Sequence, residues 1–248
     1  MRYTFPIGRL LGIPVRLHVT FLLLPLFSTW LAHAVTGEVR VAAWSAVMLV
    51  LVFGCVLLHE LGHCVVARRY GSQVMGITML PIGGVAWMSH LPERPREEAA
   101  VAIAGPLVNV ALLALLLPFT GWSALLEGWS RLPAAWSDVP GALARGNLVL
   151  CTFNLIPAFP MDGGRLLRAG LATLLPFARA TEWAARIGRV VALVLMAFGL
   201  GGVPLLVVAG AFVFVAAGRE AGAVRQREAW RGQPAAAVRQ PAALLTPT

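Results

Sequence analysis

Long apolar runs with few charges alternate with short, turn-rich segments along the chain. A helix needs about 18 to 20 mainly apolar residues to cross the hydrocarbon core of a bilayer. The last long run contains Gly199, Gly201, Gly202 and Pro204, which favour a turn between two helices. The pattern predicts an α-helical polytopic membrane protein with about six transmembrane spans, at residues 17–35, 41–67, 97–118, 142–161, 183–200 and 203–218.

Two segments beside these spans have a different pattern. Residues 2–16 place Pro and Gly among apolar residues, and residues 77–87 are β-branched and apolar but too short to span. Short runs bounded by turn residues are typical of strands. We expect short membrane-associated β-strands before the first span and between the second and third spans, within a single transmembrane domain at residues 1–218.

Composition excludes a soluble globular protein. The 248 residues are 58% hydrophobic and only 12% charged, and the mean hydropathy is +0.78. A soluble core of this size could not bury so much apolar surface. The lipid bilayer is therefore the expected environment.

The charges predict how the spans are oriented. The net charge is +9, and all 20 basic residues are arginines, which lie mostly at the ends of the apolar runs. They form no basic patch with interleaved aromatic residues, so we expect no nucleic-acid partner. With both termini in the cytoplasm, only Arg40, Arg131 and Arg145 lie outside, as the positive-inside rule favours. Residues 219–248, a basic tail rich in Ala and Pro, are expected to be cytoplasmic and disordered.

A metal-binding motif lies inside the second predicted span, where residues 59–63 read His-Glu-Leu-Gly-His. His59 and His63 are four residues apart, so on a helix they share one face and can bind one zinc ion. Glu60 can then reach a water molecule on the metal and act as its general base. Ionisable side chains within a span are costly unless they have a function.

A catalytic zinc site needs a third protein ligand, and Asp162 is the candidate. It follows the fourth predicted span in a segment broken by two prolines and two glycines, and such backbone at membrane depth must be buried in protein or line a cavity. A carboxylate that ends a helix in a wet turn is the alternative. Asn154, two helical turns earlier, could donate a hydrogen bond to the substrate or an oxyanion. It could equally make an interhelical hydrogen bond.

Zinc and a general base at this spacing predict peptide hydrolysis. A peptide bond within a helix must be unwound before attack, and an exposed strand edge at Gly83, Gly84 and Val85 could pair with the unwound segment. An ordinary surface hairpin is the alternative for these residues.

The chain resembles the bacterial site-2 proteases, a family of intramembrane zinc metalloproteases. The resemblance rests on four motifs: His59-Glu60-Leu-Gly-His63, Pro81-Ile-Gly83-Gly84, Ala104-Gly105-Pro106-Leu-Val-Asn109 and Asn154-x-x-Pro-x-x-Pro-x-Asp162-Gly163-Gly164. It implies one Zn²⁺ per chain on His59, His63 and Asp162, with Glu60 as the general base and Asn154 near the scissile carbonyl. It also implies that Asn109 and residues 83–85 contact the substrate.

The resemblance further implies a multi-pass protein of the inner cell membrane that cuts membrane-anchored regulatory proteins. An anti-sigma factor or a membrane-tethered transcription factor would be such a substrate. Many relatives carry PDZ or CBS modules, and we expect neither here. A metal transporter and a non-catalytic, helix-binding relative are the alternatives, although a transporter would not need Glu60 at this spacing.

Overall fold

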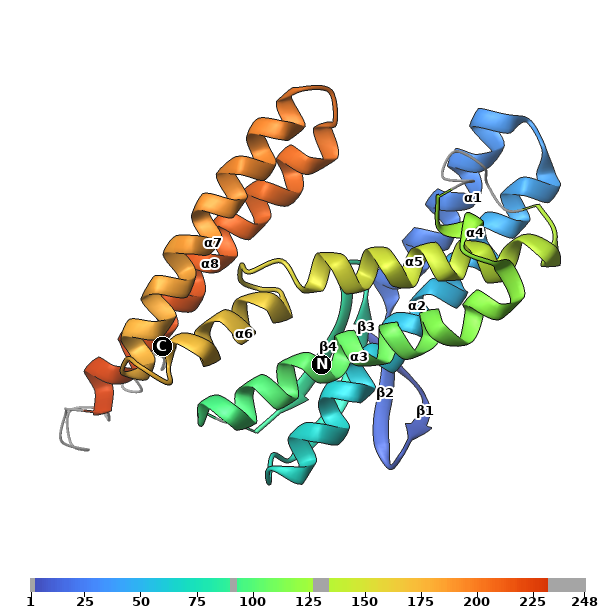
Figure 1. Ribbon diagram of the computed structural model, residues 1–248. Coiled ribbons are helices and arrows are strands. Elements are labelled where there is room, and N and C mark those ends of the chain that lie inside the picture. Colours follow the sequence, from blue (N-terminus) through green and yellow to red (C-terminus); the bar gives the residue numbers. More distant parts are fainter. Residues whose placement is uncertain (1–2, 90–92, 127–133, 232–248) are drawn as a thin grey trace, which may run out of the picture. The chain divides into compact units, whose positions relative to one another are not determined.

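The structure is a computed structural model that describes residues 3–89, 93–126 and 134–231. The chain forms two compact units, Met1–Leu155 and Ile156–Thr248 (Figure 1). The His-Glu-x-x-His motif belongs to the first unit, and Asp162 belongs to the second.

The first unit is a helical bundle joined to a small sheet. Its described helices are η1 (Val19–Leu22), α1 (Leu23–Thr36), α2 (Val39–Arg69), α3 (Pro95–Thr120), α4 (Ser123–Leu126), η2 (Trp136–Asp138) and α5 (Val139–Asn154). Helix α1 ends where Gly37 adopts a left-handed conformation, and α3 starts at Pro95 with two glutamates in its first turn. Both are favourable helix ends, since glycine tolerates positive φ and acidic residues complement the helix dipole.

The four strands form one sheet in the order β1 (Thr4–Leu10), β2 (Ile13–His18), β3 (Val74–Leu80) and β4 (Gly83–Met88). The two hairpins are antiparallel, and β2 pairs with β3 in parallel, with Val15 opposite Ile77. The strands predicted on either side of the first two spans are therefore confirmed, and they form a single sheet. Strands β1 and β4 are its two edges.

This sheet packs on the half of α2 that carries the motif. Ile13 and Ile77 from the sheet share a buried cluster with Cys64 of α2. Phe21 packs edge to face on Phe53, with ring centroids 4.7 Å apart. Close packing of these side chains thus fixes the position of α2 against the sheet.

The second unit contains α6 (Asp162–Leu171), α7 (Phe177–Leu200) and α8 (Pro204–Arg231). Helices α7 and α8 lie side by side as an antiparallel pair (Figure 1). Buried alanines, including Ala184 and Ala217, allow this close approach. Arg168 of α6 donates to Glu220 of α8 at 2.8 Å.

Five described helices are long and apolar enough to cross a membrane, judged by length and composition: Val19–Thr36, Val39–Arg69, Pro95–Thr120, Phe177–Leu200 and Pro204–Arg227. The span predicted at 142–161 differs, because α5 has only 16 residues and ends at Asn154. The last helix continues to Arg231, so disorder predicted for 219–248 does not begin at residue 219, and residues 232–248 lie outside the described part.

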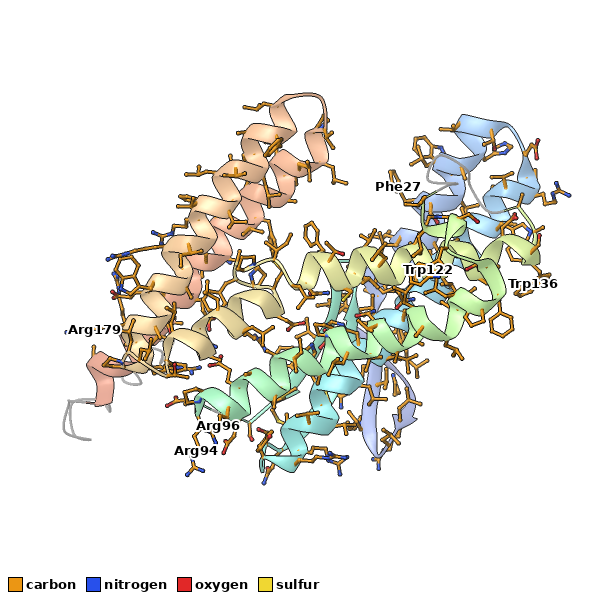
Figure 2. The ribbon with its side chains drawn as sticks, in the orientation of Figure 1. Phe27, Arg94, Arg96, Trp122, Trp136 and Arg179 are labelled. Carbon is orange, nitrogen blue, oxygen red and sulfur yellow. The ribbon has the colours of Figure 1, made fainter. Side chains whose placement is uncertain are left out.

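Exposed side chains of the first unit also suit a membrane. The aromatic residues Phe27, Trp122 and Trp136 lie toward one end of its bundle, and Arg94 and Arg96 lie toward the other (Figure 2). Aromatic residues are enriched at both membrane interfaces and arginines on the cytoplasmic side. The chain is a membrane protein, as its apolar composition predicted.

Candidate metal centre

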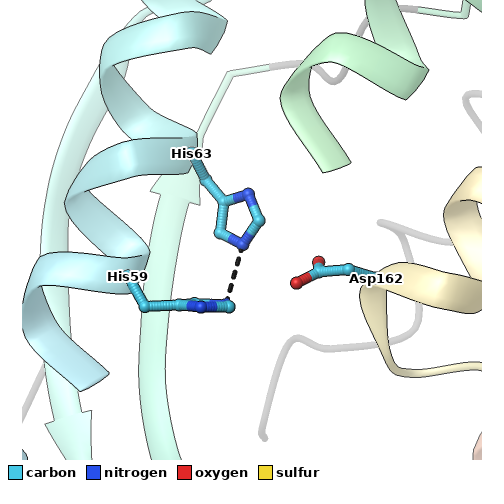
Figure 3. Close-up of side chains that lie close together, drawn as sticks. All are labelled: His59, His63 and Asp162. Carbon is cyan, nitrogen blue, oxygen red and sulfur yellow. Dashed lines mark hydrogen bonds between the residues drawn. The ribbon is translucent and has the colours of Figure 1, made fainter. Parts of the chain in front are cut away.

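The two motif histidines lie on one face of α2, one helical turn apart (Figure 3). Both are buried. Their Nε2 atoms lie 3.0 Å apart, and the two rings are nearly perpendicular, at 83°. The helical spacing predicted from the sequence therefore brings one nitrogen of each ring to the same place.

The other ring nitrogen of His63 is held by the backbone of α3. Its Nδ1 atom lies 2.7 Å from the carbonyl oxygen of Val101. A carbonyl oxygen can only accept, so Nδ1 carries a hydrogen, and in the neutral ring Nε2 then has the lone pair.

His59 is held by a side chain instead. Its Nδ1 atom lies 2.5 Å from Oδ1 of Asn109 on α3. The Nδ2 atom of Asn109 donates to Oδ1 of Asn147 on α5 at 2.9 Å. The sequence predicted substrate contact for Asn109, but its side chain is fully buried and both ends of its amide are bonded within the bundle. This arrangement favours a role in holding His59.

These two imidazoles are suited to a metal ion. Two lone pairs that face each other at 3.0 Å repel unless a cation or a shared proton lies between them. Neutral imidazoles with their second nitrogen on an oxygen acceptor are the usual form of histidine zinc ligands. Gly105 of α3 leaves the ring edges uncovered, because a Cβ atom there would lie 2.6 Å from Nε2 of His59.

Glu60 lies on the same turn of α2, beside strand β4. A Cβ atom on Gly84 would lie 2.5 Å from Cγ of Glu60, so the strand passes directly over the stem of this side chain. Gly83 and Val85, predicted with Gly84 to contact the substrate, pair with β3 opposite Leu80 and Thr78. The hairpin is confirmed, and pairing of β4 with a substrate stays a prediction.

Asn154 is the last residue of α5, where its Nδ2 atom donates to the carbonyl oxygen of Leu150 at 2.9 Å. An amide group has a second N–H, so this bond within its own helix leaves donor capacity for another acceptor. The predicted role beside the scissile carbonyl stays a prediction.

Asp162 is the first residue of α6 in the second unit. The turn before it is closed by hydrogen bonds from the Met161 amide to Ala158 and from the Gly164 amide to Met161. A Cβ atom on Gly164 would lie 2.5 Å from the carbonyl carbon of Ala158, so only glycine allows the turn to fold back so tightly. The Asp-Gly-Gly sequence thus gives Asp162 a fixed place at a helix start.

Three residues around the histidines were given no role from the sequence: Val101, Asn147 and Gly105, although Gly105 lies in one of the four motifs. The first acts through its backbone carbonyl, which no sequence pattern marks. A signal existed for Asn147, since it shares a face of α5 with Cys151 and Asn154 within an apolar run.

Comparisons with known proteins agree with this geometry. Residues 47–127 and 129–195 match peptidase family M50. A zinc metalloprotease of Methanocaldococcus jannaschii is 37% identical over 221 residues, which cover 89% of this chain and 61% of the relative. The chain belongs to peptidase family M50. A second relative, the zinc metalloprotease Rip3 of Mycobacterium tuberculosis, is 37% identical over 249 residues, covering 94% of this chain and 62% of Rip3.

The fold of this M50 chain is also that of a solved structure. A site-2 protease from Methanocaldococcus jannaschii is 36% identical, with a TM-score of 0.60, and the match covers 88% of this chain and 95% of that one. The matched M50 segments include both histidines and Asp162. The chain spans about three fifths of the length of the two curated relatives, at 61% and 62%.

Proposed function

We propose that this chain is an intramembrane zinc metalloprotease that hydrolyses peptide bonds within or near transmembrane segments. The observation that carries the proposal is the convergence of the His59 and His63 Nε2 atoms at 3.0 Å, next to Glu60, on a helix apolar enough to cross a membrane. A metal transporter would need no carboxylate at the position of Glu60. Membership of the M50 family supports the same function.

His59, His63 and Asp162 would hold the one zinc ion. Each offers one ligand atom, and two imidazoles with one carboxylate are a donor set used by zinc peptidases. The fixed start of α6 suits a ligand, because the turn before it limits the positions that Asp162 can take. Bound zinc would supply Lewis acidity to the scissile carbonyl and to the attacking water.

The chain's own residues would then move the protons and hold the substrate. Glu60 takes a proton from the attacking water and delivers it to the leaving amine. The second N–H of Asn154 donates to the oxygen that gains negative charge during the attack. Both roles are consistent with the resemblance of the motifs to those of site-2 proteases.

Strand β4 would present the substrate. It is an edge of the sheet, and an extended segment can add to such an edge through backbone hydrogen bonds. Gly83, Gly84 and Val85 lie on this edge, and Gly84 lies over the stem of Glu60. A substrate strand paired here would therefore lie beside the general base.

The substrate would be a membrane-anchored protein, such as an anti-sigma factor or a membrane-tethered transcription factor. The chain would lie in the inner cell membrane with both termini in the cytoplasm, as the arginine distribution favours. Released cytoplasmic domains would then be the signal.

The test is cleavage of a membrane-anchored test substrate whose transmembrane segment contains helix-breaking glycine and proline residues. Wild-type chain and Glu60→Gln are each purified and reconstituted in lipid vesicles, with zinc content measured on the same samples. Glu38→Gln is the matched control, because Glu38 precedes the same helix and is exposed. We expect cleavage by the wild type and Glu38→Gln, and none by Glu60→Gln although its zinc is retained. Equal cleavage by all three would contradict the role of Glu60.

A further inference from the structure

A line of buried hydrogen bonds runs from α5 through α3 to the first histidine. Asn147 donates through Nδ2 to the carbonyl oxygen of Leu143 at 2.9 Å. Its Oδ1 atom accepts from Nδ2 of Asn109 at 2.9 Å, and Oδ1 of Asn109 lies 2.5 Å from Nδ1 of His59. Asn109 and Asn147, which we call the amide relay, are 0% and 1% exposed.

The Leu143 carbonyl determines the direction of every hydrogen bond in this line. The Leu143 carbonyl only accepts, so Asn147 must turn its NH₂ group toward Leu143 and its oxygen toward Asn109. Asn109 must then turn its own NH₂ group toward Asn147 and its oxygen toward His59. That oxygen also only accepts, so Nδ1 of His59 must carry the ring hydrogen. In the neutral ring, Nε2 is then left with the lone pair that binds a metal.

Asn109 alone could not fix this outcome. An amide rotated by 180° exchanges its oxygen and its NH₂ group with almost no change of shape. The rotated Asn109 would donate to Nδ1 of His59, which would place the ring hydrogen on Nε2 and block the metal-binding position. Asn147 prevents this rotation, because its oxygen would then face the oxygen of Asn109 within a buried site.

Of the two histidines, only His59 needs such a relay. The Nδ1 atom of His63 faces the Val101 carbonyl, a backbone group that cannot exchange acceptor for donor. His59 faces a side-chain amide, so a second group must fix the direction of that amide. Two buried amides in a membrane bundle are costly unless each is bonded, and in this line both are.

We propose that Asn147 is a positioning residue for the zinc site, which acts through Asn109 to hold His59 in the tautomer that binds metal. The inference rests on the proposed function, since it takes His59 as a zinc ligand. Asn147 need not touch the metal or the substrate. Loss of outer hydrogen-bond partners of histidine ligands typically lowers metal affinity by about 10- to 100-fold.

The experiment measures zinc affinity of the purified full-length chain in detergent by competition with a chromophoric chelator. Asn147→Leu is compared with the wild type, and we expect affinity to fall about tenfold or more. Cys55→Ala is the control, because it removes the 3.3 Å contact from Asn147 Nδ2 to Cys55 Sγ and leaves the hydrogen bonds of the relay in place. Its affinity should stay within about twofold of the wild type, since thiol hydrogen bonds are weak.

The same substitution, made in a chain that also carries Asn109→Asp, separates this role from a general loss of packing. In Asn109→Asp, an ionised carboxylate can only accept, so it fixes the tautomer of His59 whichever way Asn147 turns its amide. Asn147→Leu should then lower zinc affinity by less than about twofold in that background, against about tenfold in the native one. An equal loss in both backgrounds would mean that Asn147 contributes packing alone and would overturn the proposal.

The tautomer itself can be observed in the metal-free chain by ¹⁵N NMR of labelled histidine. We expect His59 to carry its hydrogen on Nδ1 in the wild type and to populate the Nε2–H form in Asn147→Leu. An unchanged tautomer in Asn147→Leu would overturn the relay. His59→Ala serves as the reference: if it binds zinc as tightly as the wild type, the proposed metal centre itself fails, whatever Asn147 does.

Discussion

Gly105 of α3 lies so close to His59 that a Cβ atom on it would be 2.6 Å from Nε2. Helix α3 can pass the two imidazoles at this distance only because it has no side chain there. The closeness is useful at a metal site, since the helix packs against both rings and, without a side chain at Gly105, leaves the space at their Nε2 atoms open.

Gly105→Ala should therefore displace the histidines. Overpacking a buried site by one methyl group costs about 1 to 3 kcal/mol, and we expect a fall in zinc affinity of about tenfold or more. Gly54→Ala on α2 is the matched control, because a Cβ atom there meets nothing within 4 Å. Chelator competition checks both variants, and equal affinities would show that α3 can move aside without cost.

Gly84→Ala should separate the reaction from metal binding. Its Cβ atom would lie 2.5 Å from Cγ of Glu60, so the side chain of Glu60 or strand β4 must shift. A displaced general base lowers turnover, and we expect kcat to fall by about 10². Zinc content should be unchanged, since no ligand is touched. A variant with native kcat would indicate that Glu60 keeps its working position in another rotamer.

Asp162→Ala tests the third ligand. Loss of one of three protein ligands should lower zinc affinity by far more than the about 10- to 100-fold expected of an outer partner. Asp138→Ala is the control for loss of a carboxylate. Asp138 lies in the exposed η2 segment and accepts from the Ala134 and Ala135 amides. A full zinc complement in Asp162→Ala under chelator competition would assign the third ligand elsewhere.

Two arginine pairs of the second unit should differ in their effect on stability. Arg168 is 4% exposed, lies 5.0 and 4.9 Å from the Phe159 and Phe177 ring centroids, and bonds to Glu220. Arg168→Met should lower the free energy of unfolding by about 2 kcal/mol through lost stacking and ion pairing. Arg225 pairs with Glu182 at 2.6 Å but is 63% exposed, so Arg225→Met should cost less than about 1 kcal/mol.

Denaturant unfolding in detergent micelles checks this difference. Equal losses for the two arginine variants would mean that burial of Arg168 adds nothing to its ion pair.

Much of the metal centre could be predicted because helical spacing is local. A separation of four residues puts His59 and His63 on one face of any α-helix, whatever surrounds it. The break after the fourth apolar run was also visible, from the prolines and glycines that precede Asp162. The predicted end of that span was wrong, because α5 ends at Asn154 and not at residue 161.

The parts that escaped prediction depend on contacts between distant segments. The pairing of β2 with β3 joins residues on either side of two helices, and each hairpin alone gives no sign of it. For Asn109, the motif resemblance implied only a contact with substrate, which stays a prediction. Its partners, His59 and Asn147, become evident only when α2, α3 and α5 are packed together.

Zinc X-ray absorption spectroscopy on the purified wild-type chain tests the central claim most directly, together with zinc stoichiometry. The proposed centre predicts one zinc per chain, with imidazole nitrogen and carboxylate oxygen ligands at about 2.0 to 2.2 Å. It also predicts that the imidazole contribution is lost, with the zinc, in His59→Ala. A wild-type chain that binds no zinc, or zinc whose spectrum shows no imidazole and is unchanged in His59→Ala, would contradict the account.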